Sequence, residues 1–134
     1  MSQLSAYLLD VNVLLAFGVR QHPLHRHVSA WVQSGQFAAL MTCSITELGF
    51  VRVASKVYGM SVGQASALLS FMKAETRFPT KFLDDDQDAA HFPQWVQASH
   101  QTTDGHLIQL AQAHGATLAT LDSAIPGAFL IPNP

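Results

Sequence analysis

The sequence has little charge and a single cysteine. Charged residues make up 12% of its 134 residues, against about 25% in a typical globular protein, and hydrophobic residues make up 49%. Because so little charge leaves apolar surface poorly covered, we expect a buried interface with a second copy of the chain, as a homodimer, or with another protein. Cys43 is the one cysteine, which excludes an intrachain disulfide and a cysteine-based zinc site.

A signal sequence and long apolar runs are also lacking. Residues 1–5 have no positive region, and no uncharged apolar run approaches the roughly 18 residues of a membrane span. We therefore expect a soluble, cytoplasmic protein. The net charge of −2 gives no general attraction to nucleic acid, so RNA contacts would come from local clusters. The candidates for RNA binding are Arg20, Arg26, Arg52 and Lys56.

The apolar pattern alternates between strands and helices, without a repeat or linker. It predicts strands over residues 7–10, 37–41, 81–84, 116–121 and 128–131. It predicts helices over residues 25–34, 44–56, 61–75 and 103–114, and a helix or loop over 12–19. This order predicts one α/β domain over residues 1–134, with a mostly parallel sheet between helices on both faces.

Four acidic residues stand where predicted strands end or helices begin. Asp10 closes the first apolar run, and Asp122 follows the strand of residues 116–121. Glu47 and Asp104 lie in the first turns of predicted helices. Sites in parallel α/β sheets form beyond the carboxyl ends of the strands, and a cation relieves the desolvation cost of carboxylates beside apolar runs. The four acids therefore predict a metal site.

Each of these acids also has a structural explanation. Asp10 could cap the next helix, and Ser44 with Glu47 has the spacing of a capping box. The helix dipole alone would favour Asp104 in a first turn, and Asp122 could start a turn. A different role is expected for the aspartates of residues 84–88, because such a charge run is typical of a solvated loop.

Four segments, taken in order, resemble one known family. They are Leu8-Leu-Asp-Val-Asn-Val-Leu-Leu-Ala, Ser44-Ile-Thr-Glu-Leu-Gly-Phe, Thr103-Asp-Gly-His-Leu-Ile-Gln-Leu-Ala and His114-Gly-Ala-Thr-Leu-Ala-Thr-Leu-Asp122. This pattern covers nearly the whole chain and resembles PIN-domain ribonucleases of the VapC toxin type. The resemblance implies a three-layer α/β/α sandwich, a divalent metal, endonuclease activity on RNA, and a small VapB-like antitoxin that inhibits the toxin.

By motif position, the resemblance also implies the site residues. The family's acidic quartet, which is catalytic and binds metal, carries over to Asp10, Glu47, Asp104 and Asp122. Asn12 matches a polar position that supports the site, and Thr120 matches another whose role stays open. We expect Asp10 and Asp104 to bind the metal directly, while Glu47 and Asp122 complete its ligands, hold a second ion or orient the attacking water.

The chemistry explains why carboxylates would be needed. One or two Mg²⁺ or Mn²⁺ ions, which prefer oxygen ligands, would neutralise the phosphate, lower the pKa of water and stabilise the leaving oxygen. Attack by such water, with the 3′-oxygen leaving, predicts 5′-phosphate ends. A metal-free route through the ribose 2′-hydroxyl would leave a cyclic phosphate instead.

Three other functions stay open. A phosphatase could use Asp10 as its nucleophile, although its Asp-x-Asp motif would need an acid where Asn12 stands. A receiver-like signalling domain also places an Asp at a strand end, but no convincing lysine partner follows a strand. The third is a binding protein that keeps the outline of the metal site and acts only by forming complexes.

Overall fold

The computed structural model describes residues 3–74, 78 and 80–133. Its strands are β1 (Ala6–Leu9), β2 (Ala39–Cys43), β3 (Thr80–Leu83), β4 (Thr117–Thr120) and β5 (Phe129–Leu130). Its helices are α1 (Val11–Gly18), α2 (His25–Ser34), α3 (Ser44–Tyr58), α4 (Val62–Ala74), the short 3₁₀ helix η1 (Ser99–Gln101) and α5 (Thr102–Ala113). This is the predicted order of elements. The predicted end of one helix at residue 75 lies outside the described residues.

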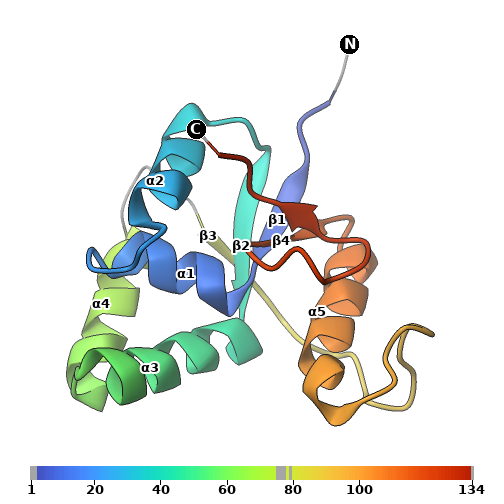
Figure 1. The fold of residues 1–134 in the computed structure, drawn as a ribbon. Coiled ribbons are helices and arrows are strands. Elements are labelled where there is room, and N and C mark those ends of the chain that lie inside the picture. The colour runs from blue at the N-terminus through green and yellow to red at the C-terminus, as the bar shows by residue number, and fades with distance from the viewer. Residues whose placement is uncertain (1–2, 75–77, 79, 134) are drawn as a thin grey trace.

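Within the described residues the strands form one parallel sheet, in the order β3-β2-β1-β4-β5 (Figure 1). At its centre Leu8 of β1 pairs with Met41 of β2 on one side and with Leu118 of β4 on the other. Because the strands run in the same direction, their carboxyl ends meet at one edge of the sheet. The chain leaves that edge into α1 from β1 and into α3 from β2.

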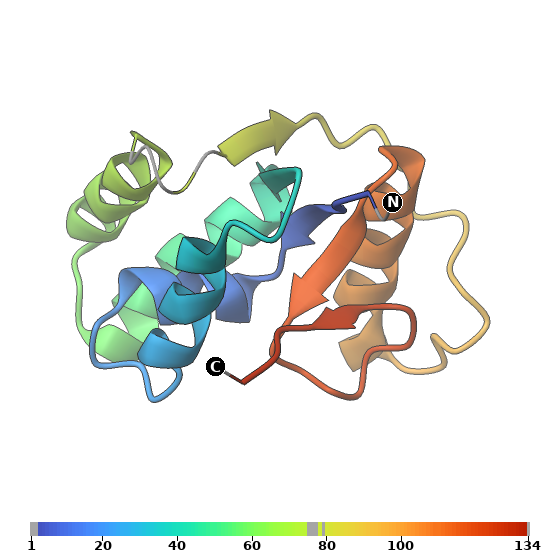
Figure 2. The same ribbon diagram turned by 90° about the horizontal axis from the view of Figure 1, so that it is seen from above.

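Two apolar cores cover the two faces of the sheet. Leu9 packs in a core with residues of α1, α2, α3 and α4, whereas its neighbour Leu8 packs in a second core with residues of α5. Figure 2 shows α5 on one side of the sheet and the other long helices on the opposite side. Both leucines are completely buried, which stabilises the fold by about 1.5–3 kcal/mol for each side chain. The predicted three-layer α/β/α sandwich is therefore confirmed, and its sheet is parallel throughout the described residues.

Two predicted boundaries are wrong for local reasons. β2 begins at Ala39 rather than at residue 37, because the Phe37 amide donates to the Gly35 carbonyl at 2.8 Å and the Phe37 ring packs on Trp31. α5 begins one residue earlier than predicted and has no side-chain cap from a threonine. It continues from η1, where the Gln101 side chain accepts hydrogen bonds from the amides before it.

No helix in the described part of the chain has both the length and the apolar character that crossing a bilayer requires.

Candidate metal centre

Asp10 lies between β1 and α1 and is buried, with 7% of its surface exposed. Its amide continues the sheet by donating to the Ala119 carbonyl at 3.0 Å, and its Oδ1 caps α1 by accepting from the Val11 amide at 2.8 Å. The predicted capping role is therefore real. It uses one carboxylate oxygen and leaves the second free for other partners.

The second oxygen of Asp10 belongs to a polar network that joins β1 to β4. Thr120 Oγ1 donates to Asp10 Oδ2 at 2.8 Å and accepts from Asn12 Nδ2 at 3.2 Å and from the Asp122 amide at 3.1 Å. Asn12 Oδ1 accepts from the Leu121 amide at 3.1 Å. Asn12 and Thr120 thus orient Asp10 and the start of the segment that carries Asp122.

Burial decides the electrostatics of Asp10. Desolvation raises the pKa of this carboxyl, and the charge of Asp122 raises it further. The hydrogen bonds from Thr120 and the Val11 amide oppose the rise because they stabilise the ionised form. Desolvation is the largest of these effects, so Asp10 carries an unfavourable negative charge that a cation would stabilise.

Asp104, in the first turn of α5, is partly buried and faces the same acids. Desolvation raises its pKa most, the charges of Asp10 and Asp122 raise it further, and His100 lowers it. Because charge interactions weaken with distance, the effect of Asp122 on Asp10, and of both on Asp104, indicates that the three aspartates lie in one neighbourhood. The structure thus brings together three of the four predicted acids.

Asp122 is exposed and has the turn role that the sequence allowed. Its Oδ1 accepts from the Ala124 amide at 2.9 Å, two residues on. That bond fixes the side chain next to the strand end and uses one oxygen. The other oxygen has no hydrogen-bond partner among the described residues, so it is free to take a ligand.

Glu47 does not form the capping box that its spacing with Ser44 predicts. The residue that caps α3 is Cys43, whose amide donates to Thr46 Oγ1 at 3.1 Å. That prediction is wrong because the helix begins one residue earlier than the capping box requires.

The carboxylate of Glu47 is instead held by two donors. Thr42 Oγ1 donates to Glu47 Oε2 at 2.6 Å, and Lys73 Nζ of α4 lies 2.7 Å from the same oxygen. The sequence analysis did not predict the contact between Glu47 and Lys73. A signal was available, because Glu47 and Lys73 lie at similar distances along the chain on either side of Gly59, where the hairpin of α3 and α4 turns.

Two glycines allow the elements that carry the acids to pack closely. A Cβ atom on Gly49 would lie 2.6 Å from a methyl carbon of Val11, the residue after Asp10. A Cβ atom on Gly105, the residue after Asp104, would lie 2.5 Å from a methyl carbon of Val96. Both distances are too short for real carbon atoms, so α3 approaches α1, and the loop before α5 approaches α5, only because glycine stands there.

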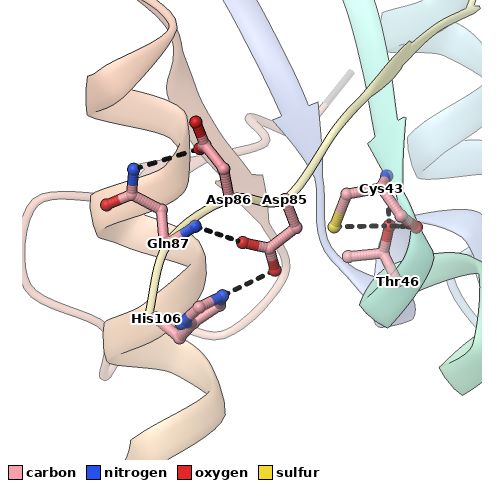
Figure 3. A network of polar contacts seen from close by, with 6 residues as sticks. All are labelled: Cys43, Thr46, Asp85, Asp86, Gln87 and His106. Atoms are coloured by element: carbon pink, nitrogen blue, oxygen red, sulfur yellow. Dashed lines mark hydrogen bonds and ion pairs between the residues drawn. The ribbon is translucent and has the colours of Figure 1, made fainter. Parts of the chain in front are cut away.

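The loop of residues 84–88 is only partly solvated, and one of its aspartates helps to hold α5. Asp85 Oδ2 lies 2.6 Å from His106 Nε2, and the Asp85 side chain is 12% exposed (Figure 3). Asp84, Asp86 and Asp88 are exposed, as the charge run predicts. The prediction is wrong for Asp85, because that residue packs against α5 two residues beyond Asp104.

The donor set suits a hard divalent cation, although the acids do not enclose one. The three aspartates supply carboxylate oxygens and Thr120 a hydroxyl oxygen, and such oxygens are the ligands of Mg²⁺ and Mn²⁺. Among the described residues, however, no three His, Cys, Asp or Glu side chains converge closely enough to hold one metal ion. The Glu47 carboxylate is bound by Lys73 and Thr42.

The four basic residues proposed for RNA binding are exposed. Arg20 follows the far end of α1, which begins at Val11 and extends about 12 Å for its eight residues, and Arg26 lies in the first turn of α2. Arg52 and Lys56 line one groove of α3 with Leu48 and Val62. The structure therefore does not bring these four together with the acids.

Residues 7–127 match the family model of the PIN domain. The chain belongs to the PIN-domain family. It is 32% identical to ribonuclease VapC38 of Mycobacterium tuberculosis over 121 residues, which cover 88% of this chain and 86% of the relative. Identity to ribonuclease VapC44 of the same species is 35% over 137 residues, which cover 90% of this chain and 92% of the relative. This PIN domain is thus of the VapC type, as the four segments predict.

A solved structure supports the same fold. The PIN-domain chain superimposes on a chain of VapBC2 from Rickettsia felis, bound to a DNA fragment from its promoter, with a TM-score of 0.60. The match covers 93% of this chain and 96% of the other at 14% sequence identity. Such low identity makes the similarity one of fold alone.

Proposed function

We propose that this VapC-type PIN domain is a metal-dependent endoribonuclease and the toxin of a toxin-antitoxin pair. The observation that carries the proposal is the polar network in which Thr120 and Asn12 hold buried Asp10 and the backbone of Asp122, close enough to Asp104 for both charges to contribute to its raised pKa. A carboxylate costs free energy at such a place, and the cost is recovered when a cation binds. The names of the curated relatives, ribonucleases, agree with this chemistry.

The residues would divide the work as follows. Asp10 and Asp104 would bind Mg²⁺ or Mn²⁺ directly, since burial first, and then the charge of neighbouring aspartates, raises their pKa values, and a cation would stabilise their ionised forms. One or two bound ions would neutralise the phosphate, activate water and stabilise the leaving oxygen. Asp122, exposed and with a free oxygen, would orient the attacking water or complete the ligands. Glu47 would complete the ligands or hold a second ion.

The bond that breaks in the reaction determines its products. Water that attacks phosphorus forms one P–O bond while the bond to the ribose 3′-oxygen breaks, and the leaving oxygen takes up a proton. The new ends are a 5′-phosphate and a 3′-hydroxyl. Attack by the ribose 2′-hydroxyl would instead give a cyclic phosphate, so the ends of the product RNA distinguish the two routes.

The test is a map of new RNA 5′ ends in cells after brief expression of the wild type, Asp10→Asn or Asp86→Asn, without any partner. Asp86 is an exposed loop aspartate and serves as the matched control. We expect discrete 5′-phosphate ends with the wild type and with Asp86→Asn, and none with Asp10→Asn. Equal maps for all three proteins, or ends with a cyclic phosphate, would contradict the proposed activity.

The proposed protein partner is a small VapB-like antitoxin. The chain would form a homodimer or a hetero-oligomer with this antitoxin, and it would act in the cytoplasm. What supports a partner is the exposed apolar surface of α3 and α4. Leu48, Val57, Val62 and Phe71 are each between 64% and 67% exposed. Covering side chains of this size favours association. Arg20, Arg26, Arg52 and Lys56 remain proposed contacts of RNA.

A second candidate function is binding without catalysis. The observation that favours it is the ion pair between Lys73 and Glu47, which neutralises one acid of the quartet. A protein of this kind would bind RNA or its partner equally well as wild type and as Asp10→Asn. Measuring RNA binding of the two proteins beside the map of 5′ ends separates the two functions.

A further inference from the structure

Lys73 contacts one acid of the quartet, Glu47, directly. Its Nζ lies 2.7 Å from Glu47 Oε2, and the Thr42 hydroxyl donates to the same oxygen at 2.6 Å. The ammonium also lies 5.2 Å from the centre of the Phe82 ring on β3, within the range of a cation–π interaction. A carboxylate, a ring and the packing of α4 against α3 therefore fix the position of this lysine.

The environment makes the ion pair stronger than one on the surface. The Glu47 side chain is 16% exposed and that of Lys73 is 33% exposed, so water screens the pair only in part. Glu47 also lies at the same edge of the sheet as Asp10, because the first turn of α3 follows β2, which pairs in parallel with β1, and Asp10 follows β1. The carboxylate thus has two possible cationic partners, Lys73 or a metal ion.

We infer that Lys73 is a built-in counter-ion of the metal centre, which holds Glu47 in the metal-free protein and exchanges with a divalent cation when metal binds. This inference rests on the proposed function, because it assumes that Asp10 and Asp104 bind metal. Lys73 is a positioning residue that acts through Glu47.

The exchange has a measurable cost. Metal that recruits Glu47 must break its contact with Lys73, so the ammonium competes with the cation for one carboxylate. Removing the lysine charge should therefore tighten metal binding and, at the same time, lower the Tm of the metal-free protein, since Glu47 then lacks its counter-ion. If Lys73 were only structural and did not compete with metal, removing its charge would lower the Tm and leave the metal affinity unchanged or weaker.

The experiment is Mn²⁺ binding by calorimetry, with Tm measured with and without Mn²⁺, on the purified full chain. In Lys73→Met we expect a Kd for Mn²⁺ lower by roughly fivefold, as follows from the value of a partly exposed ion pair, and a lower metal-free Tm. Lys73→Arg keeps the charge and should behave as wild type. Lys81→Met, at an exposed lysine of β3, is the matched control and should change neither quantity.

Two further variants decide the interpretation. In a Glu47→Gln background Lys73→Met should leave the Kd unchanged, because the effect passes through Glu47. Lys73→Gln, which removes the charge but keeps a hydrogen-bond donor, gives the same test if the methionine variant does not fold. An equal or higher Kd in both charge-removing variants overturns the inference. Absence of Mn²⁺ binding in the wild type, or binding that Asp10→Asn leaves intact, would instead overturn the proposed metal site.

Discussion

The hydroxyl of Thr120 donates to Asp10 Oδ2 across 2.8 Å, although the two residues are 110 positions apart in the chain. The same hydroxyl accepts from Asn12 Nδ2 and from the Asp122 amide. One buried side chain of β4 therefore connects the acid that follows β1 to the acid that follows β4. This arrangement makes Thr120 the junction of the candidate site.

Replacing Thr120 by Val keeps the shape of the side chain and removes its hydroxyl. The change leaves Asp10 Oδ2 without its donor and the Asp122 amide without its acceptor, which should lower the free energy of unfolding by about 1–3 kcal/mol. The pKa of Asp10 should rise further, because the hydrogen bond from Thr120 lowers this pKa in the wild type. Urea unfolding measures the first effect and NMR titration of the carboxyl the second.

Thr120→Ser is the matched control, because it keeps the hydroxyl and loses only a methyl group. It should retain the pKa of Asp10 and most of the stability. If the serine and valine variants lose stability equally and share one pKa, the hydroxyl is not what holds Asp10.

The pH dependence of stability follows from the raised pKa values of Asp10 and Asp104. Between the unfolded-state pKa of about 3.9 and the folded-state pKa, the folded protein binds more protons than the unfolded chain. The stability that each group contributes is fully present below the unfolded-state pKa and is lost as pH rises through the folded-state pKa. The metal-free protein should therefore lose stability as pH rises through that window.

The difference in Tm between Asp10→Asn and the wild type isolates this effect from other titrating groups. It should become more favourable to the variant as pH rises from about 4 through the folded-state pKa of Asp10. A constant difference for Asp10→Asn would show that its pKa is not raised.

The sequence was informative about backbone order and weak about side-chain contacts between distant elements. Apolar runs such as the one before Asp10 predicted the strands, and parallel strand ends predicted the shared edge. The partners of Glu47 were not predicted, because a contact with Lys73 depends on how α4 packs on α3. Asp85 was placed in solvent for the same reason, since only the folded loop brings it to His106.

Adding a methyl group at Gly49 should separate α3 from α1. Its Cβ would lie 2.6 Å from Val11, a short branched side chain that cannot swing away, so Gly49→Ala should cost about 1–3 kcal/mol of unfolding free energy despite the better helix propensity of alanine. Because Val11 follows Asp10, the site should be disturbed and Mn²⁺ should raise the Tm less. Denaturant unfolding and thermal melts measure both effects.

Gly63→Ala is the control for Gly49→Ala. Gly63 also lies in a helix, α4, but its Cβ would have only the Ser61 hydroxyl near it, at 4.0 Å. This substitution should leave stability unchanged or raise it by up to about 1 kcal/mol. Equal stability of the two alanine variants would show that α3 and α1 tolerate a wider separation.

Asn12 separates the hydrogen-bonding role of the site from its charge. Its Oδ1 accepts from the Leu121 amide and its Nδ2 donates to Thr120. Asn12→Ala removes both bonds and should cost about 1–2 kcal/mol at any pH. Asn12→Asp keeps the acceptor but adds a negative charge two residues from Asp10, so its cost should be small near pH 4 and grow as pH rises.

Divalent metal should stabilise one of these two variants and not the other. A cation screens the extra charge of Asn12→Asp, so Mn²⁺ should recover much of the Tm that this variant loses at pH 8. It cannot replace the bonds to Leu121 and Thr120, so Asn12→Ala should keep its deficit at the same metal concentration. Thermal melts at both pH values, with Mn²⁺ and with chelator, measure the difference. If metal restores the Tm of both variants or of neither, Asn12 does not act on the site through its hydrogen bonds to Thr120 and Leu121.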